Sequence, residues 1–392
     1  WSDLPLVLDD IERIEDIRGP NAASYGANAF LATINIITRH SAADPGGFVR
    51  ASAGSNHIRD GVLRAAGGEG NLHYRLTAGY QEDNGYAQVV DSRVIRQMTG
   101  RIDRSEGKND VEFHFGYNEG PRGRGESGNL TDIPRDQDIT SRFEQLRWRH
   151  RLDGGGDVTL QYYHVHHEWD DRYQTLPVPI PVPPFSVIIP VALDVRSDRY
   201  DFEFQHTLSA WETVRVVWGL GARQDENLSP AYLGTTQTVT EHLYRLFANV
   251  EWRATQRLLV NAGAMYEKYD ITGGDVSPRL ALNYHFLPGH TVRASISRAT
   301  RQPVAFEERS NERVCADPAC TFFDQIYLSS GQLRPERIDS SEIGYLGRIT
   351  PAINVDLRLF RDQVFDLIGD YKPPYPADLV DGKIFDFRNG GK

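Results

Sequence analysis

The chain has 392 residues, a net charge of -11 and a mean hydropathy of -0.49. The acidic balance argues against nucleic acid as a partner, because phosphate binding needs a basic surface. No apolar run approaches the roughly 18 residues that a membrane helix requires, which excludes a helical membrane protein. A β-barrel stays compatible with this composition, since only every second residue of its strands faces lipid.

The first distinctive segment is residues 11–39, IERIEDIRGPNAASYGANAFLATINIITR. Its isoleucines at 11, 14 and 17 recur at a spacing of three, which suits either a short helix or a strand with one break. Gly19 and Pro20 then end that element, because glycine permits unusual dihedrals and proline fixes φ and lacks a donor. Residues 21–32 are small, and residues 33–38 return to β-branched side chains. The segment predicts a β-turn-β unit, which a soluble α/β domain could also contain.

From residue 47 onward, the hydrophobicity alternates with a period of two, as expected of β-strands. In Leu243–Arg253 one face carries Tyr244, Leu246, Ala248, Val250 and Trp252. An apolar middle with an aromatic side chain at each end is typical of a lipid-facing strand. Residues 214–222 and 258–266 repeat this pattern.

The predicted connections alternate between short and long. Short turns are expected at residues 68–71, 105–110, 153–156, 209–212, 254–257 and 287–290. Most of the others are long, at residues 120–141, 170–195, 226–240 and 301–337. Outer-membrane barrels show this asymmetry, with short turns on the periplasmic side and long loops outside. The pattern gives about fifteen strands, with the start of another near Lys383.

Four stretches of the chain resemble TonB-dependent outer-membrane receptors, in the order expected of that family. Residues 11–39 resemble the end of the plug domain. Residues 277–308, 331–349 and 354–368 resemble strands and loop entries of the barrel. The resemblance implies an all-β fold, a transmembrane antiparallel β-barrel around the C-terminal part of an α/β plug. About 15–16 strands would be present, of roughly 22 in plugged transporters.

The expected division is the end of the plug at residues 1–40, a linker at 41–46 and a partial barrel at 47–392. We read the chain as a fragment, with the energy-coupling box and the first part of the plug before residue 1 and further barrel strands after residue 392.

The resemblance also implies particular site residues. The plug motif falls on Arg18, Gly19, Pro20, Tyr25 and Gly26. In this family plug arginines pair with barrel glutamates, which implies an ion pair between Arg18 and Glu342. Alternation supports a lumen position for Glu342, since Ile343 and Tyr345 would face lipid. The alternative is that both are lumen charges with other partners.

Two further groups have a chemical interpretation. Cys315 and Cys320 lie in a predicted extracellular loop, and an even cysteine count in an oxidising compartment favours a disulfide between them. His164 and His166 share one face of a strand, with His167 on the other. Together with nearby acids they are weak candidates for a metal site, because imidazole and carboxylate both bind transition metals. The alternative is that they are solvated side chains at a barrel rim.

The function implied by the resemblance is energy-coupled uptake of a scarce nutrient complex, a ferric siderophore or cobalamin, across the outer membrane of a Gram-negative bacterium. Its implied partners are the TonB energy-coupling protein, for the full-length parent only, the metal-chelate or small nutrient ligand, and outer-membrane lipid. No resident cofactor and no enzymatic activity are expected, because no catalytic arrangement of side chains is visible. The alternative function is a passive porin or adhesin-type barrel without energy coupling.

Overall fold

The computed structural model describes residues 4–26, 28–180, 185–315, 320, 323–372 and 384–390. Fifteen strands form one antiparallel sheet, in which neighbours in sequence are nearly always neighbours in space. The order is β23-β22-β19-β18-β17-β16-β15-β14-β9-β8-β7-β6-β5-β4-β3. The number of strands matches the fifteen expected from alternation, and the meander topology confirms the all-β prediction.

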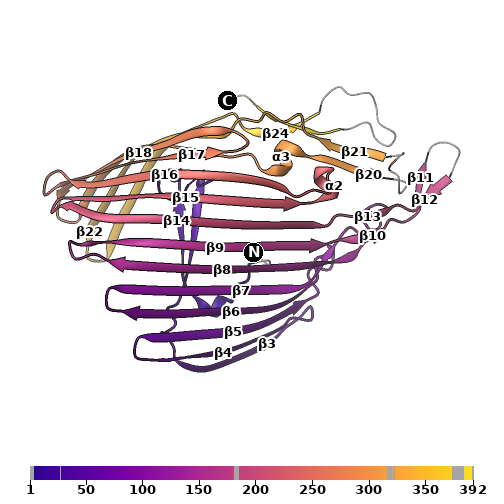
Figure 1. Cartoon of the computed structure of the whole chain (residues 1–392), viewed down its shortest axis with the longest axis horizontal. Helices are drawn as coiled ribbons and strands as arrows, with labels where there is room; N and C mark the ends of the chain where they lie inside the picture. Colours follow the sequence, from indigo (N-terminus) through magenta and orange to yellow (C-terminus); the bar gives the residue numbers. More distant parts are fainter. Residues whose placement is uncertain are drawn as a thin grey trace.

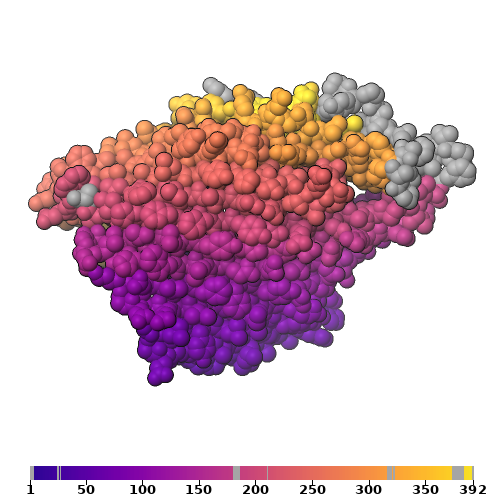
Figure 2. Space-filling model, viewed as in Figure 1, coloured from indigo at the N-terminus to yellow at the C-terminus, as the bar shows by residue number. Residues whose placement is uncertain are grey.

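The strands of this sheet have the following bounds: β3 (Gly46–Ala53), β4 (Arg59–Glu69), β5 (Leu72–Asp83), β6 (Arg93–Glu106), β7 (Asn109–Arg124), β8 (Arg135–Arg151), β9 (Gly156–Asp170), β14 (Val195–Trp211), β15 (Val214–Leu228), β16 (Val239–Arg253), β17 (Leu258–Tyr269), β18 (Gly273–Leu287), β19 (His290–Arg301), β22 (Glu336–Thr350) and β23 (Ile353–Phe365). The space-filling view shows the strands on the near face packed side by side as a continuous wall (Figure 2).

The two faces of the sheet differ as the sequence predicts. In β16 the outward side chains Tyr244, Leu246, Val250 and Trp252 are all exposed, whereas Leu243 and Phe247 on the other face are buried. The two neighbouring strands continue this row of exposed apolar side chains. Leu246 lies opposite Tyr266 of β17 on one side and opposite Leu220 of β15 on the other. One face of the sheet is therefore an apolar belt suited to lipid.

The two ends of the sheet differ as well (Figure 1). At one end, short turns join the strands, as between Glu69 and Leu72 or between Leu287 and His290. At the other end lie longer connections with their own elements: β10 (Arg172–Gln174), β11 (Val178–Ile180), β12 (Phe185–Val187), β13 (Pro190–Ala192), α2 (Pro230–Leu233), α3 (Ala305–Arg309), β20 (Asn311–Cys315), β21 (Phe323–Leu328), β24 (Ile368–Tyr371) and β25 (Asp386–Asn389).

The first long loop is shorter than predicted. Strand β7 continues to Arg124 and β8 begins at Arg135, so the expected loop at residues 120–141 shrinks to 125–134. Strand β8 has 17 residues, whereas about 9–11 cross a bilayer. The two strands stay paired along their whole length, since every residue from Asn109 to Arg124 has a partner on β8. The prediction from polar composition therefore ended β7 too early.

Residues 8–41 form a separate unit on the other side of the sheet. Helix η1 (Leu8–Asp10) leads into β1 (Ile11–Arg18), which pairs with β2 (Ala32–Thr38) as an antiparallel hairpin. Figure 1 shows both strands behind the sheet, running across its strands. A register shift between Ile11 and Arg13 is the single break that the isoleucine spacing allowed. The predicted small-residue loop contains a short helix, α1 (Ala22–Tyr25).

Among the described residues, none of the helices is long and apolar enough to cross a membrane.

Candidate functional site: the interface between the hairpin unit and the sheet

Two glycines shape the segment between β1 and β2. Gly19 has a φ of +87°, and its N–H donates to the carbonyl of Leu31 at 2.8 Å, which closes the hairpin. Gly26 also has a φ of +87° and ends α1 with an N–H bond to Ala22 at 2.8 Å. A side chain with a Cβ is strained at such dihedrals. Tyr25 is the last residue of the helix, and its side chain lies outside the described part of the chain.

The tip of the unit docks on the inner face of the sheet. Ala22 and Phe30 pack with Ala299 and Ile338 in the described buried apolar cluster. Polar contacts surround this small core. Asn249 donates to the carbonyl of Ala23 at 3.1 Å, Arg279 donates to Asn21, the N–H of Asn28 donates to Thr300 at 3.0 Å, and the N–H of Gln302 donates to Asn28 at 3.0 Å.

Arg18 and Glu342 both lie in the described part of the chain, and in the structure each forms an ion pair with a different residue. Arg18 instead bonds Asp16 at 3.0 Å, two positions away on the same strand, and its side chain is 82% exposed. Glu342 faces Arg293 at 3.3 Å, on the neighbouring strand. Both residues line a cavity of about 670 Å³ between the Arg-Gly-Pro turn and the sheet. Both side chains border this cavity, but each has a nearer partner. This arrangement corresponds to the alternative stated above, in which both are lumen charges with other partners.

We expect Arg18 and Glu342 to be energetically independent. In a double-mutant cycle of Arg18→Ala and Glu342→Ala, measured by thermal unfolding in detergent, the coupling energy should stay below about 0.5 kcal/mol, since the two charges are solvated and paired elsewhere. The pair Arg293→Ala and Glu342→Ala is the matched comparison and should couple more strongly. Coupling above about 1 kcal/mol between Arg18 and Glu342 would instead indicate a direct pair.

The strongest polar attachment is at the other end of the unit, at Asp10. This carboxylate is 2% exposed and sits among side chains of three sheet strands. It accepts hydrogen bonds from Thr77 at 3.0 Å and Thr99 at 2.8 Å, and it pairs with Arg75 at 3.1 Å and Arg64 at 3.8 Å. A buried carboxylate with this many donors fixes one geometry. No motif pointed to Asp10, because its partners come together only through the register of β4, β5 and β6.

A second attachment joins the end of β2 to the sheet through Arg101 and Asp103. Arg101 donates to the carbonyl of Thr38 at 3.0 Å and to Asp103 at 2.8 Å. Asp103 in turn accepts from the backbone N–H of Ser41 at 2.9 Å. The arginine therefore links β6 of the sheet to the last residue of the hairpin.

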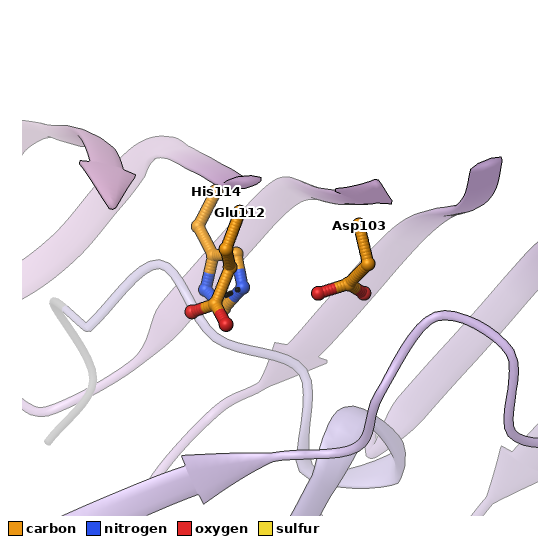
Figure 3. A group of neighbouring side chains, drawn as sticks. All are labelled: Asp103, Glu112 and His114. Carbon is orange, nitrogen blue, oxygen red and sulfur yellow. Dashed lines mark ion pairs between the residues drawn. The ribbon is translucent and has the colours of Figure 1, made fainter. Parts of the chain in front are cut away.

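Beside this attachment, Asp103, Glu112 and His114 place one ligand atom each within 4.8 Å of one another (Figure 3). His114 lies 3.2 Å from Glu112 on the same strand, and Asp103 approaches from β6. However, Arg101 already contacts both carboxylates, at 2.8 Å and 3.2 Å. A guanidinium therefore supplies the positive charge that a metal ion would bring.

The structure brings His164 and His166 together on the outward face, as the sequence allowed. Both bond one carboxylate oxygen of Asp198, at 3.0 Å and 2.8 Å. His164 also bonds Glu144 at 2.9 Å, and His166 lies 3.5 Å from Glu168. Among the described residues, these histidines do not belong to a trio of converging ligand atoms. Their arrangement is a chain of hydrogen bonds centred on Asp198.

The outer loops enclose a second cavity, of about 390 Å³. Its described walls come from residues 190–193, from α2 and the residues after it, and from β20. Cys315 and Cys320 line it and are joined by a disulfide, with 4.8 Å between their Cα atoms. Glu312 also lines this cavity, and burial raises its pKa to about 7.

Glu312 should make the outer loops more stable in acid. The pKa of Glu312 is higher in the folded loops than in the opened ones, so ionisation favours the opened loops. The stability of the folded loops should therefore fall as the pH rises from about 4.5 to about 7. The Glu312→Gln variant should lose this pH dependence, measured as the rate of loop cleavage by a protease active across the range. The matched control, Glu126→Gln on another outer loop, should keep it. An identical pH profile for wild type and Glu312→Gln would contradict the assignment.

Comparison with known proteins assigns the family. The model for the TonB-dependent receptor-like β-barrel matches residues 79–392 of the chain. The chain belongs to the TonB-dependent receptor family.

Relatives within this receptor family have been described by sequence and by structure. The vitamin B12 transporter BtuB of Vibrio vulnificus is 37% identical over 95% of this chain and 58% of its own length. The siderophore receptor PirA of Pseudomonas aeruginosa has a TM-score of 0.74 at 16% identity, covering 98% of this chain and 67% of that one. The FrpB iron transporter of Neisseria meningitidis has a TM-score of 0.75 at 12% identity, covering 98% and 65%.

These structural likenesses establish the fold of a TonB-dependent receptor. The chain spans a little over half the length of the curated relatives that it matches. Each relative named above is itself a receptor or transporter.

Proposed function

We propose that the complete receptor takes up a metal-chelate nutrient, cobalamin or a ferric siderophore, across the outer membrane of a Gram-negative bacterium. In this proposal residues 1–40 are the last part of the plug, and transport is coupled to the TonB protein. The vitamin B12 transporter among its sequence relatives and the siderophore receptors among its structural relatives support this class of cargo.

The observation that carries the proposal is the character of the interface between the hairpin unit and the sheet. Its apolar cluster is small, and at the tip it is surrounded by single hydrogen bonds, some of them from residues that border a cavity. Single hydrogen bonds of this kind can exchange with water at little net cost, because the net contribution of one hydrogen bond is only about 1 kcal/mol. The buried Asp10 at the other end is the firmer attachment. An interface held in this way can be remodelled without unfolding the barrel.

The test is an uptake assay in cells that express the full-length receptor. Radiolabelled cyanocobalamin and ferric enterobactin are offered separately, with and without a protonophore. We expect one of the two to accumulate, and accumulation to stop when the proton gradient is dissipated. Accumulation that continues without the gradient would identify a passive barrel. Titration of the purified receptor with each ligand then reports binding apart from transport.

A further inference from the structure

The short helix α3 lies among the outer loops, beside α2 (Figure 1). It follows directly on β19, the strand whose outer end touches the tip of the hairpin unit. A helix of five residues has little stability of its own, because isolated helices shorter than about 12–15 residues are marginal in water. Helix α3 therefore stays folded only as long as its contacts with other elements hold.

The hairpin unit holds the start of this segment through Asn28. The backbone N–H of Asn28 donates to the carbonyl of Thr300 at 3.0 Å, and its side-chain oxygen accepts the N–H of Gln302 at 3.0 Å. Asn28 has a φ of +73°, a left-handed conformation that asparagine tolerates better than most residues. Gln302 is only 3% exposed, so bulk water cannot readily replace a lost acceptor there.

Arg301, between these two contacts, ties α3 to the wall of the sheet. Its guanidinium donates two hydrogen bonds to Glu336 of β22, at 2.5 Å and 2.9 Å. It donates two more to Glu307 of α3, at 3.1 Å and 3.0 Å. Glu307 also accepts the N–H of Val304 at 2.9 Å. Since bidentate pairs between arginine and carboxylate fix direction as well as distance, the backbone at residues 300–302 sets the position of α3.

Helix α3 in turn holds two of the outer connections. The ring of Phe306 lies 5.7 Å from that of Tyr232 in α2 and 5.3 Å from that of Tyr327 in β21. The carboxylate of Glu308 accepts the N–H groups of residues 332 and 333, at 2.8 Å and 3.0 Å. Helix α2 belongs to the connection between β15 and β16, and β21 belongs to the one between β19 and β22. These two connections therefore meet at α3.

We propose that α3 couples the hairpin unit to the outer loops, with Asn28 and Arg301 as the positioning residues. The bond from Gln302 to Asn28 holds the end of β19 in the geometry that docks α3. Its loss releases α3 and loosens residues 327–335. The linkage is reciprocal, because a coupling free energy acts equally in both directions. Its role in uptake rests on the proposed function: outer loops that become ordered around a cargo would strengthen the contact between β19 and the hairpin unit.

Hydrogen exchange of the full-length receptor in detergent, read by mass spectrometry without any ligand, tests the first direction. Asn28→Gly removes the side-chain acceptor and keeps the left-handed backbone, which glycine adopts freely. Exchange at residues 303–310 and 327–335 should become about tenfold faster, since the buried N–H of Gln302 loses its partner. Asn28→Asp keeps an acceptor and should restore nearly the wild-type rate. A change confined to residues 28–31 would overturn the proposal.

The second direction is tested from the outer loops. Phe306→Leu removes the ring contacts of α3 and should speed exchange at residues 28–31. The matched control is Tyr173→Leu on another outer connection, where the ring lies 3.8 Å from the guanidinium of Arg135. It should leave residues 28–31 unchanged. Equal exchange at residues 28–31 in wild type and Phe306→Leu would contradict the linkage. Neither measurement uses a cargo or a proton gradient, so its failure is distinguishable from a failure of the uptake assay.

Discussion

Replacing Asp10 with alanine should detach the base of the hairpin unit from the barrel wall. The substitution leaves the buried guanidinium of Arg75 without its carboxylate and removes the acceptor of two threonine hydroxyls. Breaking a buried pair in this way costs about 3–5 kcal/mol. In limited proteolysis of the full-length receptor in detergent, cleavage near residues 8–18 should accelerate by two orders of magnitude or more, while the barrel stays intact (about 1.4 kcal/mol per factor of ten).

The matched control for Asp10→Ala is Asp16→Ala, on the same hairpin. Asp16 pairs with the exposed Arg18, so its loss should change stability by less than about 1 kcal/mol. The conservative change Asp10→Asn keeps an acceptor for one hydroxyl and should fall between the two. Equal cleavage rates for Asp10→Ala and Asp16→Ala would show that the base of the hairpin unit is held by other contacts.

Replacing Phe30 with alanine should loosen the other end of the hairpin unit. Phe30 is 6% exposed and packs with Ala22, Ala299 and Ile338, which has 1% exposure. Removing a buried phenyl ring costs about 3–5 kcal/mol, and alanine residues around it leave little that can collapse into the space. Hydrogen exchange of the full-length receptor, read by mass spectrometry, should show faster exchange of the backbone at residues 19–31.

Leu31 supplies the control for Phe30. Its side chain is 66% exposed, so Leu31→Ala should change stability by no more than about 0.5 kcal/mol. Its carbonyl still accepts the bond from Gly19, because that contact belongs to the backbone. Exchange that rises equally in both variants would mean that the tip of the hairpin unit is not held by this apolar cluster.

Much of the fold could be predicted from the sequence because its determinants are local. The side chains of β16 alternate so regularly that the outward face of that strand, from Tyr244 to Trp252, was assigned correctly residue by residue. Gly19 and Pro20 marked the turn of the hairpin, and the isoleucine spacing allowed for its bulge. Short turns were located because each contains few residues between two alternating runs.

The contacts that hold the hairpin unit could not be predicted in the same way. Asp10 meets Arg75, Thr77 and Thr99 only because the register of β5 and β6 places those residues side by side, 65 or more positions along the chain. Family likeness pointed instead to Arg18 and Glu342, which lie on the same cavity but have nearer partners.

The length of the central strands bears on how a ligand would be captured. At about 3.4 Å per residue, the 17 residues of β8 and of β14 carry hydrogen-bonded backbone well above the apolar belt. The outer loops therefore begin at the ends of hydrogen-bonded strands, above the membrane surface. Since a loop with fixed ends has fewer conformations to lose on binding, this architecture reduces the entropic cost of closing around a ligand.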